Sequence, residues 1–141
     1  NTKDGIVNKE VGGDSVPGYK LLLLNLSTEQ LYFNISDGSQ SYDFYSLADI
    51  PTRQWVHFAL VWDDDSEANT KFFVNGSVTD DYKYSTHSAI NDTSNSDPLT
   101  IGRGDNYGTP ADYFGGRLDD IRIYNRALTA AQIMELYNVG R

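Results

Sequence analysis

The chain has 141 residues, with 20 acidic and 11 basic side chains, so its formal net charge at neutral pH is −9. This balance argues against a nucleic-acid partner and against anionic membranes, because both are bound through clustered Lys and Arg. The chain contains no cysteine, which excludes disulfides, thiolate metal sites and cysteine nucleophiles. No apolar run approaches the length that spans a bilayer, and the length predicts a single domain.

Three short runs near the N-terminus are rich in apolar and aromatic residues, and each predicts a β-strand. They cover residues 18–25, 30–36 and 41–47. Residues 54–62 give the strongest strand prediction, since both alternating faces of this run are largely apolar, and we expect this strand to be central in its sheet. Residues 71–74 predict its hairpin partner, which ends at the turn dipeptide Asn75-Gly76.

Polar loops alternate with further short strands in the second half of the chain. Residues 85–98 and 104–112 are rich in small polar residues and predict solvated loops. Residues 99–103 and 116–124 predict two more strands, although the apolar positions of 116–124 alternate imperfectly. Short strands separated by turn signals predict an all-β antiparallel sandwich.

One helix is predicted at the C-terminal end. Thr129 and Gln132 have the spacing of a capping box, in which each side chain bonds the backbone of the other residue. Ile133, Leu136 and Tyr137 then recur at helical spacing, and Gly140 supplies a stop signal. The helix is therefore short and amphipathic, and we expect it to lie against the rim of the sandwich.

The segment 113–129 closely resembles the closing signature of laminin-G-like jelly rolls, which belong to the concanavalin A-like lectin/glucanase superfamily. Residues 54–62 and 71–76 resemble the central strand of that family and the strand and turn that follow it. Residues 6–9 and 18–21 resemble an earlier strand pair. The resemblance covers nearly the whole chain, and it is specific for the fold rather than for a ligand.

The resemblance implies that residues 1–141 form one jelly-roll domain, an antiparallel β-sandwich with a short C-terminal helix. One feature departs from the family pattern: nothing before Asn1 corresponds to the family's opening strands. We therefore expect an unpaired sheet edge, because a missing strand leaves its neighbour without a partner. Either the parent chain was cut, or a partner chain or another segment of a larger assembly supplies the strands.

The resemblance also implies a structural Ca²⁺ bound by Asp119, because the first Asp of the matching motif is often a calcium ligand in such domains. Carboxylates and carbonyls can supply the six to eight oxygens that Ca²⁺ needs. In the alternative interpretation, Asp119 accepts backbone hydrogen bonds and Asp120 pairs with Arg122 or Arg117. The acidic run 63–67 lacks the spacing of an EF-hand loop and is expected to be solvated charge.

The acidic residues do not form the pattern of a glycoside hydrolase. The glucanase branch of the superfamily uses paired acids on one strand face. The chain has four Glu, at positions 10, 29, 67 and 135, and none has a second acid two positions away inside an apolar strand. His57 lies in the strongest strand and is expected to be packed or hydrogen-bonded. We therefore expect no enzyme activity.

Three short segments combine tyrosine with polar side chains, which is the mixture that recognises sugars. Aromatic rings pack on the C–H faces of a sugar while Asp, Asn or Arg bind its hydroxyls. The predicted ligand-binding residues are Tyr42, Asp43, Tyr45, Tyr84, Asp105, Asn106 and Tyr107. The alternative for each tyrosine is packing in the core or at its rim.

These observations predict a non-catalytic module of a larger protein, extracellular or at a cell surface, that binds a glycan or a cell-surface protein. Two alternatives stay open: a structural or protein-interaction module of a surface fibre or assembly, and an accessory domain of a glycoside hydrolase. The functional prediction rests on analogy between folds.

Overall fold

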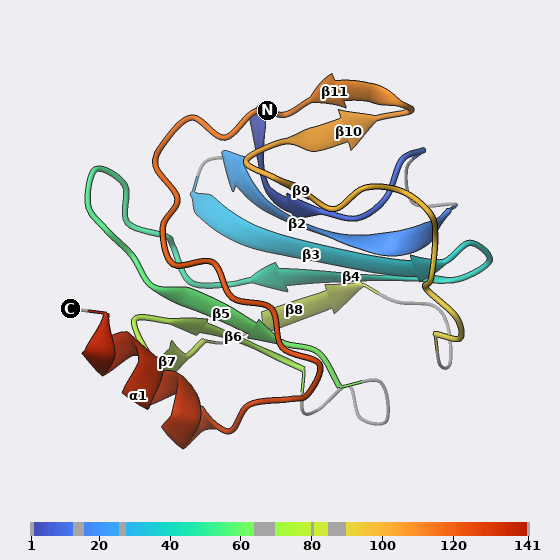
Figure 1. Cartoon of the computed structure of the whole chain (residues 1–141). Helices are drawn as coiled ribbons and strands as arrows, with labels where there is room; N and C mark the ends of the chain where they lie inside the picture. The colour runs from blue at the N-terminus through green and yellow to red at the C-terminus, as the bar shows by residue number, and fades with distance from the viewer. Residues whose placement is uncertain are drawn as a thin grey trace.

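Two antiparallel sheets form the layers of the molecule (Figure 1), in a computed structural model that describes residues 2–12, 16–25, 28–63, 70–79, 81–84 and 90–140. The larger sheet contains, in chain order, β1 (Thr2–Asn8), β2 (Pro17–Asn25), β3 (Glu29–Asp37), β4 (Ser41–Ser46), β8 (Asp81–Tyr84) and β9 (Thr100–Ile101). Its spatial order is β8-β4-β3-β2-β1-β9. The smaller sheet contains β5 (Phe58–Val61), β6 (Lys71–Val74) and β7 (Ser77–Val78) in that order. A hairpin of β10 (Gly104–Asn106) and β11 (Thr109–Ala111) and the helix α1 (Ala130–Val139) complete the described elements.

The hydrophobic core lies between the two sheets, where alternate residues of each strand meet. Phe33 of β3 and Phe44 of β4 are buried there together with Phe72 of β6. The Trp62 ring lies against this group, with ring centroids 5.5 Å from Phe44 and 5.7 Å from Tyr42. Because successive side chains point to opposite faces of a strand, the residues between these core positions are turned to the outer face of the larger sheet.

The strands expected in residues 18–25, 30–36, 41–47 and 71–74 are confirmed as β2, β3, β4 and β6. Within residues 99–103 only the two residues of β9 are paired. The turn at Asn75-Gly76 is also confirmed, with φ of 50° and 78°, the left-handed values of a two-residue hairpin turn.

The prediction of a long central strand over residues 54–62 was wrong in two respects. The strand is limited to β5, and in the described part of the chain β5 pairs with β6 alone, so it is an edge strand. Residues 54–57 precede it without ladder pairing, and Trp55 is 66% exposed. One face of this run packs against the core, and on the other face His57 packs on Tyr137 of the C-terminal helix.

The strand predicted over residues 116–124 is not formed; this fully described segment contains no ladder. Asp120 has φ of 51°, a left-handed conformation that interrupts an extended chain, and its N–H donates to Asp119 Oδ1 at 2.8 Å. Asp120 also binds Arg122 through both carboxylate oxygens. Local side-chain bonds thus replace the ladder that the alternation suggested.

The loop predicted over residues 104–112 contains the β10–β11 hairpin, which turns at Tyr107 and Gly108 with φ of 51° and 83°. This hairpin packs directly on β1. A methyl group on Gly5 would overlap the backbone of Arg103 and Gly104, so only glycine permits this approach. The Gly5 N–H donates to Asp112 O at 2.6 Å, which fastens the end of the hairpin to β1.

The predicted C-terminal helix is confirmed, including its capping box. Gln132 N–H donates to Thr129 Oγ1, and Thr129 N–H donates to Gln132 Oε1. The Gly140 N–H closes the helix on Leu136 O. Ile133 is the buried residue of the helix, and α1 contacts the smaller sheet near β7 (Figure 1). Among the described helices, none is long and apolar enough to cross a membrane.

Candidate ligand-binding face

A row of polar residues crosses the outer face of the larger sheet. The register pairs Lys20 of β2 with Asn34 of β3, Asn34 with Asp43 of β4, and Asp43 with Tyr84 of β8. On the other side of β2, Asn8 of β1 is paired with Lys20. Because paired residues on neighbouring strands share a face, these five positions form one continuous row, which we call the polar row.

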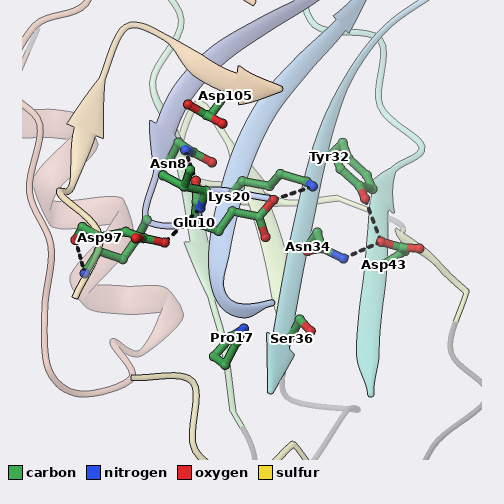
Figure 2. A network of polar contacts seen from close by, with 12 residues as sticks. Asn8, Glu10, Pro17, Lys20, Tyr32, Asn34, Ser36, Asp43, Asp97 and Asp105 are labelled. Atoms are coloured by element: carbon green, nitrogen blue, oxygen red, sulfur yellow. Dashed lines mark hydrogen bonds and ion pairs between the residues drawn. The ribbon is translucent and has the colours of Figure 1, made fainter. Parts of the chain in front are cut away.

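Asp43 is the centre of the polar row. Its Oδ1 accepts two hydrogen bonds, from the Tyr32 hydroxyl at 2.6 Å and from Asn34 Nδ2 at 2.8 Å (Figure 2). Both bonds fall on the same oxygen, and within the described residues none reaches Oδ2. Asp43 is half-buried. Its carboxylate is therefore held in one orientation with one oxygen left to accept from a ligand.

Asn34 is the buried support of this arrangement, with an exposed fraction of 0%. Its amide nitrogen binds Asp43 and, at 3.4 Å, Tyr42 O. Its carbonyl oxygen has no hydrogen-bond partner in the described part of the chain. A buried, unsatisfied polar atom costs about 1–3 kcal/mol, so this position is not explained by stability alone.

An apolar patch borders Asp43 on the same face. The rings of Tyr32 and Tyr45 lie 4.9 Å apart between centroids and are tilted by 42°. Leu22 and Leu24 of β2 pack with Tyr32 in this patch, and Tyr45 covers it at the rim. Leu22, Leu24 and Tyr32 are buried, so the half-buried Tyr45 is the part of this cluster that adjoins the fixed carboxylate at the surface. A ring beside a carboxylate is the combination that binds a sugar ring.

The charged groups at the other end of the row are engaged with the protein itself. Lys20 Nζ lies 2.7 Å from Glu10 Oε1, and both side chains are nearly buried. Asn8 Nδ2 donates to Glu10 O at 2.7 Å (Figure 2). This end of the polar row therefore fixes the turn after β1 and offers no isolated charge to a ligand.

The segment 90–99 is fastened to the sheet at two points. Asn95 Nδ2 donates to Lys9 O and to Pro17 O, each at 2.7 Å. At the other point, Asp37 Oδ2 accepts from the N–H and the side-chain amide of Asn91, both at 3.1 Å. Hydrogen bonds from Ser39, Gln40 and Asn91 hold the pKa of Asp37 far below its ordinary value. The segment therefore forms a fixed border of the outer face.

The predicted ligand-binding residues fall into separate places. Asp43 and Tyr45 lie together on the outer face, and the register places Tyr84 beside Asp43, although the side chains of Tyr84 and Asn106 lie outside the described residues. Tyr42 is 3% exposed and packs in the core against Trp62 and Phe44, so it faces away from Asp43.

The other predicted group lies on the β10–β11 hairpin. Asp105 Oδ1 accepts from Gly108 N–H at 2.6 Å and stabilises the turn, and Tyr107 at the tip is 79% exposed. Asn106 is paired through its backbone with Thr109. Figure 2 shows Asp105 on β10 beyond Asn8, at the opposite end of the polar row from Asp43. The hairpin is thus a separate feature.

Within the described residues, the contacts of Asp119 are with its neighbours in the chain. Asp119 is exposed, its Oδ1 accepts from the backbone of Asp120, and both oxygens of Asp120 bind Arg122. Among the described residues no group of three acidic or histidine side chains could hold a metal ion. These contacts match the alternative interpretation given above, in which Asp120 pairs with arginine. Most of the acidic run 63–67 lies outside the described residues.

The glutamates occupy separate elements. Glu10 is bound to Lys20, Glu29 begins β3, and Glu135 is exposed on α1, while Glu67 lies outside the described residues. Burial, together with Asp4 and Asp49, raises the pKa of Glu29. His57 packs on the Tyr137 ring at 5.7 Å between centroids.

Sequence reasoning missed Tyr32, Asn34 and Lys20 as parts of the site. A signal was available: Asn34 interrupts an otherwise apolar and aromatic strand. The turn around Gly38 places Asn34 opposite Asp43 in the β3–β4 hairpin. Combining the polar interruption with the hairpin register would have placed the two side chains together.

Antiparallel sheets packed as a sandwich, with one short C-terminal helix, are the architecture of a jelly-roll domain. A family model, Laminin_G_3, described as the concanavalin A-like lectin/glucanases superfamily, matches residues 2–134, and the chain belongs to this family. Domains of the superfamily often bind carbohydrate or mediate adhesion, and laminin-G-like domains are generally non-catalytic. Neither a curated protein nor a solved structure matched the chain.

Proposed function

We propose that the protein is a carbohydrate-binding module whose ligand lies on the outer face of the larger sheet, at Asp43 and Tyr45. The observation that supports this is the fixation of Asp43 through one oxygen by Tyr32 and the buried Asn34. A sugar hydroxyl donates to the other oxygen, Oδ2, and the Tyr45 ring packs on the adjacent C–H face. The buried amide is retained because it orients the carboxylate.

The ligand in this proposal is a neutral glycan. The cation of the polar row, Lys20, is paired with Glu10, and the net charge of −9 repels anionic sugars. The setting is extracellular or on a cell surface, as part of a larger protein, with a glycan or a glycosylated surface protein as partner. The described glutamates lie in separate parts of the fold and do not form a pair of acids, which supports binding without hydrolysis.

A neutral-glycan array tests this proposal. We expect binding by the wild-type chain and a loss of about tenfold or more for Asp43→Asn, since a hydrogen bond to a charged group contributes about 1.5–3 kcal/mol. Tyr45→Ala should weaken binding as well. Glu135→Gln is the matched control: it removes the same charge from an exposed helical position and should leave binding unchanged.

Silence of the array, with and without Ca²⁺, would exclude this function and favour a structural module. Melting curves of the three variants show whether each is folded. Equal binding by Asp43→Asn and the wild-type chain would show that the glycan is bound elsewhere on the molecule.

A further inference from the structure

A pocket of about 310 Å³ lies away from the polar row, between the β6–β7 turn and the end of α1. Its described lining consists of Gln54, Trp55, His57, Asn75, Tyr137 and Gly140. The residues come from three places in the chain: the segment before β5, the turn after β6, and the last turn of the helix. The smaller sheet and the core separate this pocket from Asp43.

Hydrogen bonds hold the walls of the pocket in place. Asn75 N–H donates to His57 O at 2.7 Å, and His57 N–H donates to Asn75 Oδ1 at 3.2 Å. The His57 ring packs against Tyr137, which joins the helix to the segment before β5. The pocket therefore exists before any ligand arrives, and little ordering is needed on binding.

Two groups in the lining are not explained by packing. Trp55 is 66% exposed although it is one of the largest apolar side chains in the chain. His57 Nδ1 is buried and has no hydrogen-bond partner among the described residues. An exposed indole presents a flat apolar surface to a ligand, whereas His57 Nδ1 is enclosed by the protein and is not accessible from the pocket.

The described lining residues carry no charged side chain, which favours a neutral ligand. Gln54 and Asn75 carry amides, and burial lowers the pKa of His57, with Arg122 acting in the same direction and Asp120 against it, so the imidazole is neutral at pH 7. The volume is at the lower end of the roughly 300–1,000 Å³ of small-molecule pockets. It suits a ligand the size of one sugar ring.

We propose that this pocket binds a single neutral sugar ring, which stacks on Trp55 while its hydroxyls bond to the side-chain amides of Gln54 and Asn75. This is a second site, independent of the one at Asp43. It lies on the smaller sheet and α1, whereas Asp43 lies on the outer face of the larger sheet. One domain with two such sites bridges two glycan chains, and simultaneous binding raises the overall affinity.

The test is a titration of the whole chain with neutral monosaccharides and their methyl glycosides at millimolar concentration. Tryptophan fluorescence reports on the pocket, because the chain has two tryptophans and Trp62 is packed in the core. We expect a saturable fluorescence change in the wild-type chain. Trp55→Ala should lower the affinity for the sugar about tenfold or more, and because this variant lacks the fluorophore, its affinity is measured from the amide chemical shifts of His57, Asn75 and Gly140. Tyr113→Ala removes an equally exposed aromatic side chain, 65% exposed, and is the control that should bind normally.

The two sites are distinguished by measuring binding at each site in the variant of the other site. In this proposal Asp43→Asn keeps the response of the pocket, and Trp55→Ala keeps the binding at Asp43. No response to any sugar of the panel overturns the pocket proposal. So does a response of equal affinity in Trp55→Ala and the wild-type chain, whatever the result at Asp43.

Discussion

Asn34 shows how a residue inside a strand can serve a neighbouring side chain. Its amide has no access to solvent, and its carbonyl oxygen is unpaired within the described residues. The nitrogen is nevertheless used, because it binds the same oxygen of Asp43 that the Tyr32 hydroxyl binds. Two donors on one oxygen orient the carboxylate more firmly than either would alone.

His57 makes the stability of the protein sensitive to pH. Burial, and to a lesser degree Arg122, lowers the pKa of His57 from its ordinary value of about 6.5. As the pH falls, the imidazole of the unfolded chain binds a proton first, so the free energy of unfolding decreases below about pH 6.5. We expect His57→Gln to lose part of the fall in melting temperature that the wild-type chain shows between about pH 7.5 and 5.

Thermal unfolding of both proteins across that range measures the effect. Other groups titrate equally in the two chains, so the difference between the curves belongs to His57. Parallel curves would contradict the prediction, because they would mean that the imidazole has the same pKa in the folded and unfolded chains.

At the scale of elements, the helix depends on a turn of the smaller sheet. Gly76 has φ of 78°, and a methyl group there would lie 2.9 Å from Met134 Sδ and 3.0 Å from Tyr137 Cδ1. Gly76→Ala combines a left-handed conformation with a steric overlap against α1. We expect it to reduce the free energy of unfolding by about 1–2 kcal/mol or more, as measured by urea denaturation.

Gly140→Ala is the matched control for this prediction. Gly140 has φ of −84°, and a methyl group there would make ordinary contacts of 3.6 Å and 4.0 Å. This variant should unfold close to the wild-type midpoint. Equal midpoints for Gly76→Ala and Gly140→Ala would show that α1 is not packed closely on the turn.

Elements with strong local signals could be predicted from the sequence, and elements that depend on tertiary partners could not. The capping box of Thr129 and the Asn75-Gly76 turn are determined by adjacent residues, and both are confirmed. The segment 116–124 has strand-like composition, but the left-handed Asp120 and its bonds to neighbouring residues prevent a ladder. Nothing in the local pattern indicates that outcome.

The candidate site shows the same limit. Asp43 and Tyr45 could be found because tyrosine and aspartate alternate in a short segment. Tyr42 shares that composition, yet the pleat of β4 sends it to the core, where it is 3% exposed. The pocket at Trp55 could not be predicted, because its walls combine residues 54–57 and Asn75 with residues of α1 that lie more than 60 positions further along the chain.

At the scale of the whole molecule, calcium is a remaining prediction of the family resemblance. The described residues include no group of three acidic or histidine side chains that could hold a metal ion, so in this prediction further ligands come from outside them. We expect added Ca²⁺ to raise the melting temperature, a chelator to lower it, and Asp119→Asn to remove the difference. Asp97→Asn in segment 90–99 is a charge-matched control. A transition that is unchanged by calcium and by chelation would count against a structural ion.

The order of the larger sheet has a consequence for how the protein folds. β1 to β4 form a meander of successive hairpins, whereas β8 and β9 join its two edges from much later in the chain. Contacts between near neighbours close short loops and form early; β9 must return to β1 from about 90 residues away. Tyr32, Asn34 and Asp43 all belong to the β3–β4 hairpin. We therefore expect the hydrogen bonds to Asp43 to form early, during synthesis of the chain. The closure of the smaller sheet and the pairing of β9 are expected to be the slow steps.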